Sequence, residues 1–480
     1  MKAAQVQIKK KNELYLVVEC EPNIRFALAE KYSFEVQGHK FMPTFRSGVW
    51  DGKIRLFSIT SGQIYYGLLN NLTNFLDESG YTWELENIDK PSTVDVDEYI
   101  ESLKLPFEIR DYQIETIKQC ITNHRRLIIS PTSSGKTLSL YAIANYYKQF
   151  GKVLILFPNT NLVMQTRLEF IKYGMDARCL HEIFEDRSKH TEKSIVLATW
   201  QGLYTQSKAY FKQYDCVIVD EAHTAVAKSI TTIMHHLENC KYRFGFTGTL
   251  SGAKINELQL VGLFGDCNQV VTTKQLIENK QISDVIIKII LLKHNYKMFD
   301  SYNDELEYIV THPGRNKFIE NLVGNLKGNT LVLFSRVEQQ GLPLYERFTK
   351  NLVHKITHLV YGDIKSEKRE EIRQIVETQN NAIIVASYQT YQQGINIKNL
   401  HNIVFAAPSK SRIRNLQSIG RGLRLHDSKS CATIYDIADD ISIAELKNHT
   451  LKHLMNRITY YAEEQLNFTI TEINIIKKLK

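Results

Sequence analysis

The sequence predicts an α/β protein: two successive lobes, each on a parallel β-sheet, with a small α/β domain in front and a short helical element behind. Three observations support this prediction. Short apolar runs recur from residue 107 onward and fall into two groups. The stretches between them have the spacing of amphipathic helices. Runs that are apolar on both faces and separated by helices are typical of parallel sheets.

The front domain is expected over residues 1–87, which hold short strand-like runs such as 14–18 and 53–57. Residues 88–106 are polar and acidic with a proline at either end, which indicates a linker or a bridging helix. The first lobe is expected over 107–290 and the second over 291–445. Residues 446–480 have apolar side chains at helical spacing, which indicates a packed helix.

Composition and charge fit a folded globular protein. The chain has 480 residues, 43% hydrophobic and 23% charged, and is long enough for several buried cores. Its formal net charge of +8 permits an anionic partner such as nucleic acid but does not require one. The 7 cysteines are scattered, which argues against a disulfide framework or a zinc ribbon. No apolar run approaches the roughly 20 residues of a membrane span, so we expect a cytoplasmic protein without a membrane partner.

A polar loop, residues 130–137, joins the apolar run 127–129 to a predicted helix. Phosphate binding needs backbone N–H groups at a helix N-terminus, an ammonium group and a hydroxyl for Mg²⁺. Gly135 would let the backbone approach a phosphate, Lys136 would reach the β- and γ-phosphates and Thr137 would hold Mg²⁺. Ser133 and Ser134 complete the loop. Ser130 stands where the usual motif has glycine, so an ordinary strand-to-helix turn is the alternative.

A second apolar run, 216–219, ends in two carboxylates, Asp220 and Glu221. Phosphoryl transfer to water needs an acid that holds the metal and a group that orients the water. Asp220 suits the metal and Glu221 suits the water. Two acids at a strand end could also merely cap the next helix. Together with the phosphate loop, however, they predict a nucleoside triphosphatase.

The segment 220–223, Asp-Glu-Ala-His, is identical to the DEAH box, and the chain resembles the superfamily 2 helicases in the order of its other motifs. The resemblance implies two tandem RecA-like lobes with ATP and Mg²⁺ as cofactors. It places Arg110, Gln113 and His223 around the nucleotide, with Gln113 on the adenine edge. It also assigns DNA contacts to residues of two motifs, which are Asn159, Thr160, Thr199 and Trp200.

The second lobe resembles the same family over residues 386–396 and 417–424. There the resemblance places Gly394 and Gln417 at the nucleotide and makes Arg421 and Arg424 the source of an arginine finger. Which arginine is the principal finger stays open. Asn396 replaces the Asp common in the family, and Gly248 replaces an Ala. Both departures concern coupling between the lobes rather than ATP hydrolysis.

In the front domain, cations are interleaved with aromatic residues between 40 and 57. Arg46, Lys53 and Arg55 are the predicted nucleic-acid contacts, because cations neutralise phosphates and aromatic rings stack on bases. The alternative is that the aromatic residues form the core of this domain and the cations simply face solvent.

Segments 32–38 and 45–56 resemble the N-terminal domain of the UvsW-like recombination helicases of tailed phages. The resemblance implies an ATP-dependent helicase or translocase acting on branched or duplex DNA and RNA–DNA hybrids. Branch migration, fork regression and R-loop removal are its implied activities, in recombination, replication and repair. Single-strand-binding or recombination proteins are candidate partners, and the host cytoplasm is the implied location. A duplex translocase subunit of a restriction system and an ATP-independent nucleic-acid clamp are the alternatives.

Overall fold

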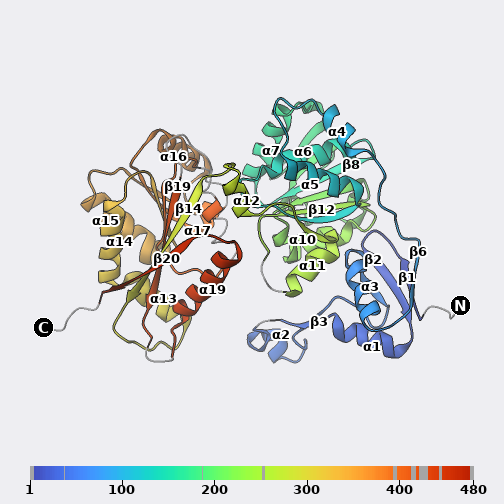
Figure 1. The fold of residues 1–480 in the computed structure, drawn as a ribbon, viewed down its shortest axis with the longest axis horizontal. Coiled ribbons are helices and arrows are strands. Elements are labelled where there is room, and N and C mark those ends of the chain that lie inside the picture. Colours follow the sequence, from blue (N-terminus) through green and yellow to red (C-terminus); the bar gives the residue numbers. More distant parts are fainter. Residues whose placement is uncertain are drawn as a thin grey trace. The chain divides into compact units, whose positions relative to one another are not determined.

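The computed structural model describes residues 5–475 apart from 37, 186, 251–253, 393–396, 412–417, 421–430 and 443–445 (Figure 1). The chain divides into two compact units. The first comprises residues 1–130 and 135–270, and the second comprises residues 131–134 and 271–480. Among the described helices, none is long and apolar enough to cross a membrane.

The front domain is built on a four-stranded mixed sheet in the order β5-β2-β1-β6. Its strands are β1 (Val6–Lys10), β2 (Tyr15–Cys20), β5 (Gln63–Tyr65) and β6 (Trp83–Glu86). Two helices, α1 (Pro22–Lys31) and α3 (Leu69–Glu78), share a core with this sheet through Leu28, Leu72 and Leu76. A separate antiparallel ribbon pairs β3 (Ser33–Glu35) with β4 (Lys53–Arg55). Between its strands lie η1 (His39–Phe41), α2 (Pro43–Arg46) and a turn.

Residues 88–106 pack against the first lobe and contain the helix α4 (Val96–Ser102). Asp95 caps this helix, because its side chain accepts from the backbone N–H groups of residues 97 and 98. Val96 is 6% exposed and belongs to the core of the first lobe. The Tyr99 hydroxyl donates to the Ala142 carbonyl at 2.6 Å. The segment therefore contains a helix that packs on the first lobe.

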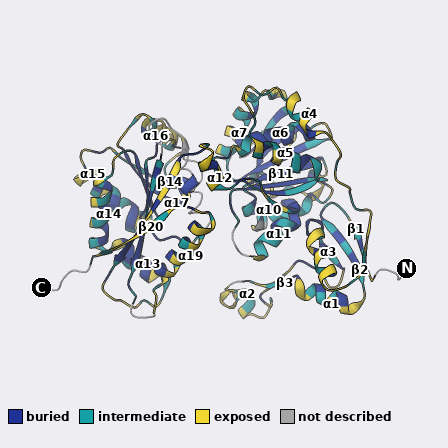
Figure 2. Ribbon diagram, in the orientation of Figure 1, coloured by how far each residue is buried: buried dark blue, intermediate teal, exposed yellow. Residues whose placement is uncertain are grey.

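The first lobe is a seven-stranded parallel sheet in the order β13-β7-β12-β11-β8-β10-β9. Its strands are β7 (Arg125–Ile129), β8 (Lys152–Phe157), β9 (Leu180–Ile183), β10 (Ile195–Thr199), β11 (Tyr214–Asp220), β12 (Tyr242–Thr247) and β13 (Cys267–Gln269). Its helices are α5 (Asp111–Thr122), α6 (Lys136–Tyr147), α7 (Thr160–Lys172), α8 (Trp200–Leu203), α9 (Lys208–Phe211), α10 (Lys228–His236) and α11 (Lys254–Phe264). The central strands β8, β10, β11 and β12 consist almost entirely of buried residues (Figure 2), as expected of runs that are apolar on both faces, whereas the edge strand β13 has none.

The second lobe is a seven-stranded parallel sheet in the order β16-β17-β15-β18-β19-β14-β20. Its strands are β14 (Asp284–Lys293), β15 (Thr330–Phe334), β16 (Thr357–Val360), β17 (Ile383–Ser387), β18 (Asn402–Phe405), β19 (Cys431–Asp440) and β20 (Phe468–Asn474). Its helices include α12 (Thr273–Glu278), α13 (Tyr302–Thr311), α14 (Pro313–Asn325), α15 (Leu342–Asn351), α16 (Ser366–Thr378), α17 (Tyr388–Gln392) and α19 (His449–Glu463). The two predicted parallel-sheet lobes are confirmed.

Two boundaries of the second lobe differ from the expected ones. β14 begins at Asp284 and pairs with β19, so the second sheet starts before residue 291. The tail holds the expected packed helix, α19, but also β20, which pairs with β14 at the edge of the sheet. β20 has no fully buried residue, and its sequence therefore lacks the apolar run by which the other strands were predicted.

Candidate nucleotide site and nucleic-acid surfaces

The phosphate loop joins the end of β7 to the start of α6, which begins at Lys136. Gly135, the residue before this helix, has φ of +81°, and Ser133 has φ of +70°. The positive φ at position 135 favours glycine, and a Cβ there would lie 2.6 Å from the Gln113 side-chain nitrogen and displace it. Ser130 is not among the positive-φ residues and donates its N–H to the Thr247 carbonyl at 2.9 Å. Serine is therefore accommodated where the usual motif has glycine.

Gln113, near the start of α5, is 5% exposed and lies against the phosphate loop. Its side-chain amide donates to the Gly135 carbonyl at 3.4 Å and accepts from the Arg110 N–H at 3.1 Å. The Arg110 guanidinium donates to the Tyr112 hydroxyl at 2.8 Å. The structure thus brings Gln113 to the loop that the sequence assigned to phosphates. A contact of Gln113 or Arg110 with adenine stays a prediction.

The two carboxylates follow β11, which is separated from β7 in the sheet only by β12. The Lys136 ammonium lies 3.8 Å from Glu221 Oε1, and Glu221 Oε2 lies 3.4 Å from His223 Nδ1. The same His223 nitrogen lies 3.0 Å from the Thr247 hydroxyl, which donates to the Thr249 carbonyl at 2.8 Å. A polar chain therefore runs from the phosphate loop through the DEAH box to the end of β12. Sequence spacing did not reveal this link between His223 and Thr247.

Asp220 is 8% exposed, and its carboxylate accepts from the Glu221 N–H at 3.0 Å. Burial raises the pKa of Asp220 to about 6, helped by Glu221 and opposed by Lys136. The charged carboxylate is therefore short of positive charge, and a divalent cation would supply it. Carboxylate and hydroxyl oxygens, here from Asp220 and Thr137, are the ligands that Mg²⁺ prefers.

A group of three or more His, Cys, Asp or Glu that could hold a metal by itself is absent from the described residues. Mg²⁺ commonly takes only one or two protein ligands and completes its shell with substrate phosphates and water. The donors at the phosphate loop fit a metal held in this way. Gly394, Gln417, Arg421 and Arg424 lie outside the described residues, so their predicted roles at the nucleotide stay predictions.

The residues predicted to contact DNA in the first lobe lie at helix N-termini. The Asn159 side chain caps α7 by accepting from the Leu162 N–H at 3.0 Å, and Thr160 is the first residue of that helix. The Thr199 hydroxyl accepts from the Gly202 N–H at 3.3 Å and caps α8. Trp200 is 9% exposed and packs in the core, which leaves little of its ring for stacking on bases. All of these hydrogen bonds and packing contacts lie within the first lobe. They therefore do not test whether the four residues contact DNA.

In the front domain, residues 40–57, where cations alternate with aromatic residues, include both exposed and buried side chains. Arg46, Lys53 and Arg55 are all exposed, and Arg55 also forms an ion pair with Asp51. Among the aromatic residues, Phe57 is 1% exposed and belongs to the domain core, while Phe41 is 77% exposed. The core alternative therefore holds for Phe57, whereas β4 and the segment between β3 and β4 keep cations and the Phe41 ring on the surface.

The front domain is joined to the first lobe by specific contacts around Arg125, at the start of β7. The Arg125 guanidinium donates to the backbone carbonyl and the carboxylate of Glu13, each at 3.1 Å. It also lies 3.7 Å from the centre of the Tyr66 ring. Beside this contact, a Cβ on Gly67 would lie 2.0 Å from the Val261 carbonyl oxygen. No sequence pattern indicates this seam, because Glu13 and Arg125 are 112 residues apart.

Three family models match the chain: "DNA helicase UvsW, N-terminal" over residues 5–86, "Type III restriction enzyme, res subunit" over 106–252 and "Helicase conserved C-terminal domain" over 314–426. The ATP-dependent DNA helicase UvsW of enterobacteria phage T4 is 33% identical, over 95% of this chain and 97% of its own length. The chain belongs to the UvsW family of superfamily 2 helicases. The predicted family is thereby confirmed, and with it ATP-dependent helicase activity.

Solved structures agree with this family. The crystal structure of T4 UvsW covers 98% of this chain and 100% of its own, with a TM-score of 0.52 and 30% identity. The Type ISP restriction-modification enzyme LlaBIII bound to DNA shares the fold, with a TM-score of 0.57 at 14% identity over 77% of this chain and 32% of its own. The restriction-enzyme family model matches part of the first lobe, whereas the UvsW N-terminal model matches the front domain.

Proposed function

We propose that this UvsW-family protein uses ATP and Mg²⁺ to remodel branched DNA and to remove RNA–DNA hybrids. Branch migration, fork regression and R-loop removal in recombination, replication and repair are the activities we assign to it. The observation that carries the proposal is the UvsW-type front domain joined by its seam to a lobe that holds Lys136 beside Glu221. The host cytoplasm is the proposed place of action, with single-strand-binding or recombination proteins as partners.

Each residue of the nucleotide site has a distinct role in this proposal. Lys136 binds the β- and γ-phosphates, and Thr137 and Asp220 would hold Mg²⁺, which neutralises charge on the phosphates. Glu221 orients the attacking water. His223 lies between Glu221 and Thr247, so a shift of Glu221 on ATP hydrolysis would change the position of the segment after β12. Arg421 and Arg424 stabilise the charge that develops on the γ-phosphate.

Arg46 and Lys53 contact DNA phosphates in this proposal, and the exposed Phe41 stacks on an unpaired base. Arg55 contributes less, because Asp51 already neutralises its charge. The seam at Arg125 fixes the front domain to the strand that leads into the phosphate loop. DNA held by the front domain would therefore move together with the ATP-binding lobe.

A second candidate function is the duplex translocase of a restriction system, favoured by the match of residues 106–252 to a restriction enzyme subunit. Such a motor moves along duplex DNA without separating strands and works with a nuclease or a methylase. An ATP-independent clamp is a weaker alternative. It would have no use for the Lys136–Glu221 pair at the phosphate loop.

An unwinding assay with forks, four-way junctions, R-loops and plain duplex tests the proposal. We expect ATP-dependent resolution of the branched substrates and R-loops. Lys136→Ala should still bind them but leave them intact, because it lacks the ammonium group on the phosphates. Translocation on plain duplex without strand separation would favour the restriction-type motor. Equal remodelling by Lys136→Ala would favour the clamp.

The DNA-binding role of the front domain is best tested in the full-length chain, because truncation would uncover the seam. Arg46→Glu with Lys53→Glu should weaken junction binding and flatten its salt dependence, by about 0.9 in log–log slope for each phosphate that is no longer neutralised. Lys11→Glu with Lys31→Glu is the matched control, since both lysines are exposed in the same domain outside the ribbon. Equal effects of the two double variants would assign the weaker binding to net charge alone.

A further inference from the structure

Four buried side chains converge on one short stretch of backbone in the second lobe. This stretch, residues 406–409, follows β18 directly, and we call it the exit segment. Arg315 and Gln340 each donate to the Ala406 carbonyl at 2.8 Å. The Tyr388 hydroxyl donates to the Ala407 carbonyl at 3.0 Å, and Arg457 donates to the Ser409 carbonyl at 3.1 Å.

The four donors come from different parts of the lobe. Arg315 lies on α14, Gln340 on η5 (Val337–Gly341), Tyr388 on α17 and Arg457 on α19. None of them is more than 2% exposed. Four elements that are distant in sequence therefore bond the backbone carbonyls of the exit segment.

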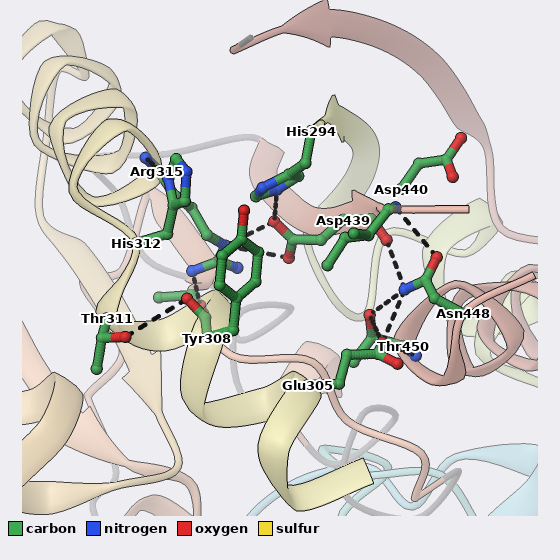
Figure 3. Close-up of polar contacts among 12 residues, drawn as sticks. His294, Glu305, Tyr308, Thr311, His312, Arg315, Asp439, Asp440, Asn448 and Thr450 are labelled. Atoms are coloured by element: carbon green, nitrogen blue, oxygen red, sulfur yellow. Dashed lines mark hydrogen bonds and ion pairs between the residues drawn. The ribbon is translucent and has the colours of Figure 1, made fainter. Parts of the chain in front are cut away.

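Two aspartates on β19, the strand next to β18, hold the arginines in place. Arg457 makes two bonds of 2.8 Å to the carboxylate of Asp436. Arg315 Nε lies 2.8 and 3.0 Å from the two carboxylate oxygens of Asp439. Figure 3 shows Arg315 and His294 turned toward Asp439. In both cases one guanidinium nitrogen that does not bond the carboxylate donates to the exit segment.

The start of α19, the helix that carries Arg457, is fixed by a further buried carboxylate. Glu305 of α13 accepts from the Asn448 side chain and the Thr450 N–H, both at 2.7 Å (Figure 3). It also accepts from the His449 N–H at 2.8 Å. Burial acts to raise the pKa of Glu305, but these donors hold it below its ordinary value. The helix is thus anchored at its N-terminus by a charged carboxylate.

Stability alone does not account for two buried ion pairs at this position. Desolvation of two charges costs about as much as their attraction returns, and apolar replacements are often equally stable. The directional contacts with backbone carbonyls are what apolar side chains could not supply. The exit segment leads along the chain into residues 417–424, which carry Arg421 and Arg424.

We propose that Arg315, Gln340, Tyr388 and Arg457 are positioning residues that fix the exit segment and thereby orient the arginine finger of the second lobe. This inference rests on the proposed function of Arg421 and Arg424. Loss of one donor to the exit segment should slow the chemical step of ATP hydrolysis and leave nucleotide binding unchanged, because the finger acts on charge that develops in the transition state.

Tyr388→Phe and Tyr147→Phe form a matched test. Both phenols are buried, and each hydroxyl donates to a backbone carbonyl: that of Tyr388 to the exit segment, and that of Tyr147 in the first lobe to Cys120 at 2.8 Å. We expect Tyr388→Phe to lower kcat for DNA-stimulated ATP hydrolysis by about 3–10-fold at unchanged KM, as one hydrogen bond predicts. Tyr147→Phe should keep kcat within about 2-fold of wild type. A purely structural role would lower Tm alike in both and leave kcat alone.

Arg457→Lys removes the planar fork while keeping the charge opposite Asp436, and should lower kcat by about 10-fold or more. Arg243→Lys in the first lobe is its control, because Arg243 is equally buried and bonds three carbonyls away from the exit segment. It should lower Tm and keep kcat. If Arg457→Lys does not fold, the milder Tyr388→Phe still decides the matter. Wild-type kcat in folded exit-segment variants would overturn the proposal.

A double-mutant cycle separates this inference from the proposed function. Arg421→Ala and Arg424→Ala should each be combined with Tyr388→Phe. If the exit segment acts through the finger, Tyr388→Phe has little further effect once the finger is removed. Additive losses would overturn the positioning role while leaving the finger intact. Wild-type kcat in both single arginine variants would instead overturn the finger assignment itself.

Discussion

The two lobes bury guanidinium groups in different ways. In the first lobe, Arg243 is 0% exposed and donates to the carbonyls of Met234, Leu237 and Leu263 at 2.7 to 3.1 Å. These carbonyls lie at the ends of α10 and α11, where helix dipoles place partial negative charge. Arg243 takes part in none of the ion pairs found among the described residues. In the second lobe, Arg457 faces a full carboxylate, that of Asp436.

The electrostatic consequence is opposite in the two lobes. Burial lowers the pKa of Arg243 to about 10. Burial also acts to lower the pKa of Arg457. The charge and hydrogen bonds of Asp436 outweigh burial and raise this pKa above its ordinary value. Arg243 joins two helix ends within its lobe. Arg457 instead connects a charged strand residue to the exit segment, so the carboxylate in the second lobe gives the guanidinium a fixed direction.

The largest effect should come from Asp436→Ala, which leaves the Arg457 charge buried and unpaired. We expect the free energy of unfolding to fall by about 3–5 kcal/mol. Urea denaturation followed by circular dichroism measures it. Asp436→Asn keeps the shape and one acceptor and should lose less. A loss below about 1 kcal/mol for Asp436→Ala would show that the carboxylate matters little.

Arg243→Met should have a smaller effect, because it removes donors from three carbonyls but leaves no unpaired charge. About 1–3 kcal/mol is expected from carbonyls left without partners. The same denaturation experiment compares it directly with Asp436→Ala. If Arg243→Met proves the more damaging of the two, helix ends hold a buried guanidinium better than a carboxylate does, and the contrast between the lobes is reversed.

The smallest effect concerns pH. Burial acts to raise the pKa of Asp439, but Arg315 and His294 hold it below its ordinary value of 3.8. A carboxyl whose pKa is lower in the folded state stabilises fully above its unfolded-state pKa, and this is lost as pH falls through the folded-state pKa. Wild-type stability should therefore drop below about pH 4, and the drop should be shallower in Asp439→Asn. Parallel acid-unfolding curves would contradict this.

Much of the fold and the nucleotide site follows from local sequence. The phosphate loop and the two carboxylates were predicted because each lies within a few residues of a strand that is apolar on both faces. Lys136 and Glu221 meet because β7 and β11 are close neighbours in one parallel sheet. The edge strand β20 was missed because its exposed, polar side chains leave no periodic apolar signal.

Contacts between distant residues could not be predicted in this way. Arg315 and Asp439 are 124 residues apart, and each alone resembles an ordinary charged surface residue. Only the folded structure shows that both are buried and that they form an ion pair. The burial of Trp200 is another example, since its motif suggested a DNA contact, which stays a prediction, and did not indicate that the residue packs in the core. Residue type and spacing indicate chemistry reliably only where neighbours in sequence are also neighbours in space.

The seam between the front domain and the first lobe has a consequence for domain exchange. A front domain grafted from a relative would bring its own equivalents of Glu13, Tyr66 and Gly67 but not their partners in the lobe. A side chain at position 67 would meet the backbone oxygen of Val261, whatever residue stands at 261. Without a carboxylate at position 13, Arg125 would keep only its bond to the backbone carbonyl there. A chimera would therefore need a graft with glycine at 67 and an acid at 13, or a replacement for Arg125 made together with the graft.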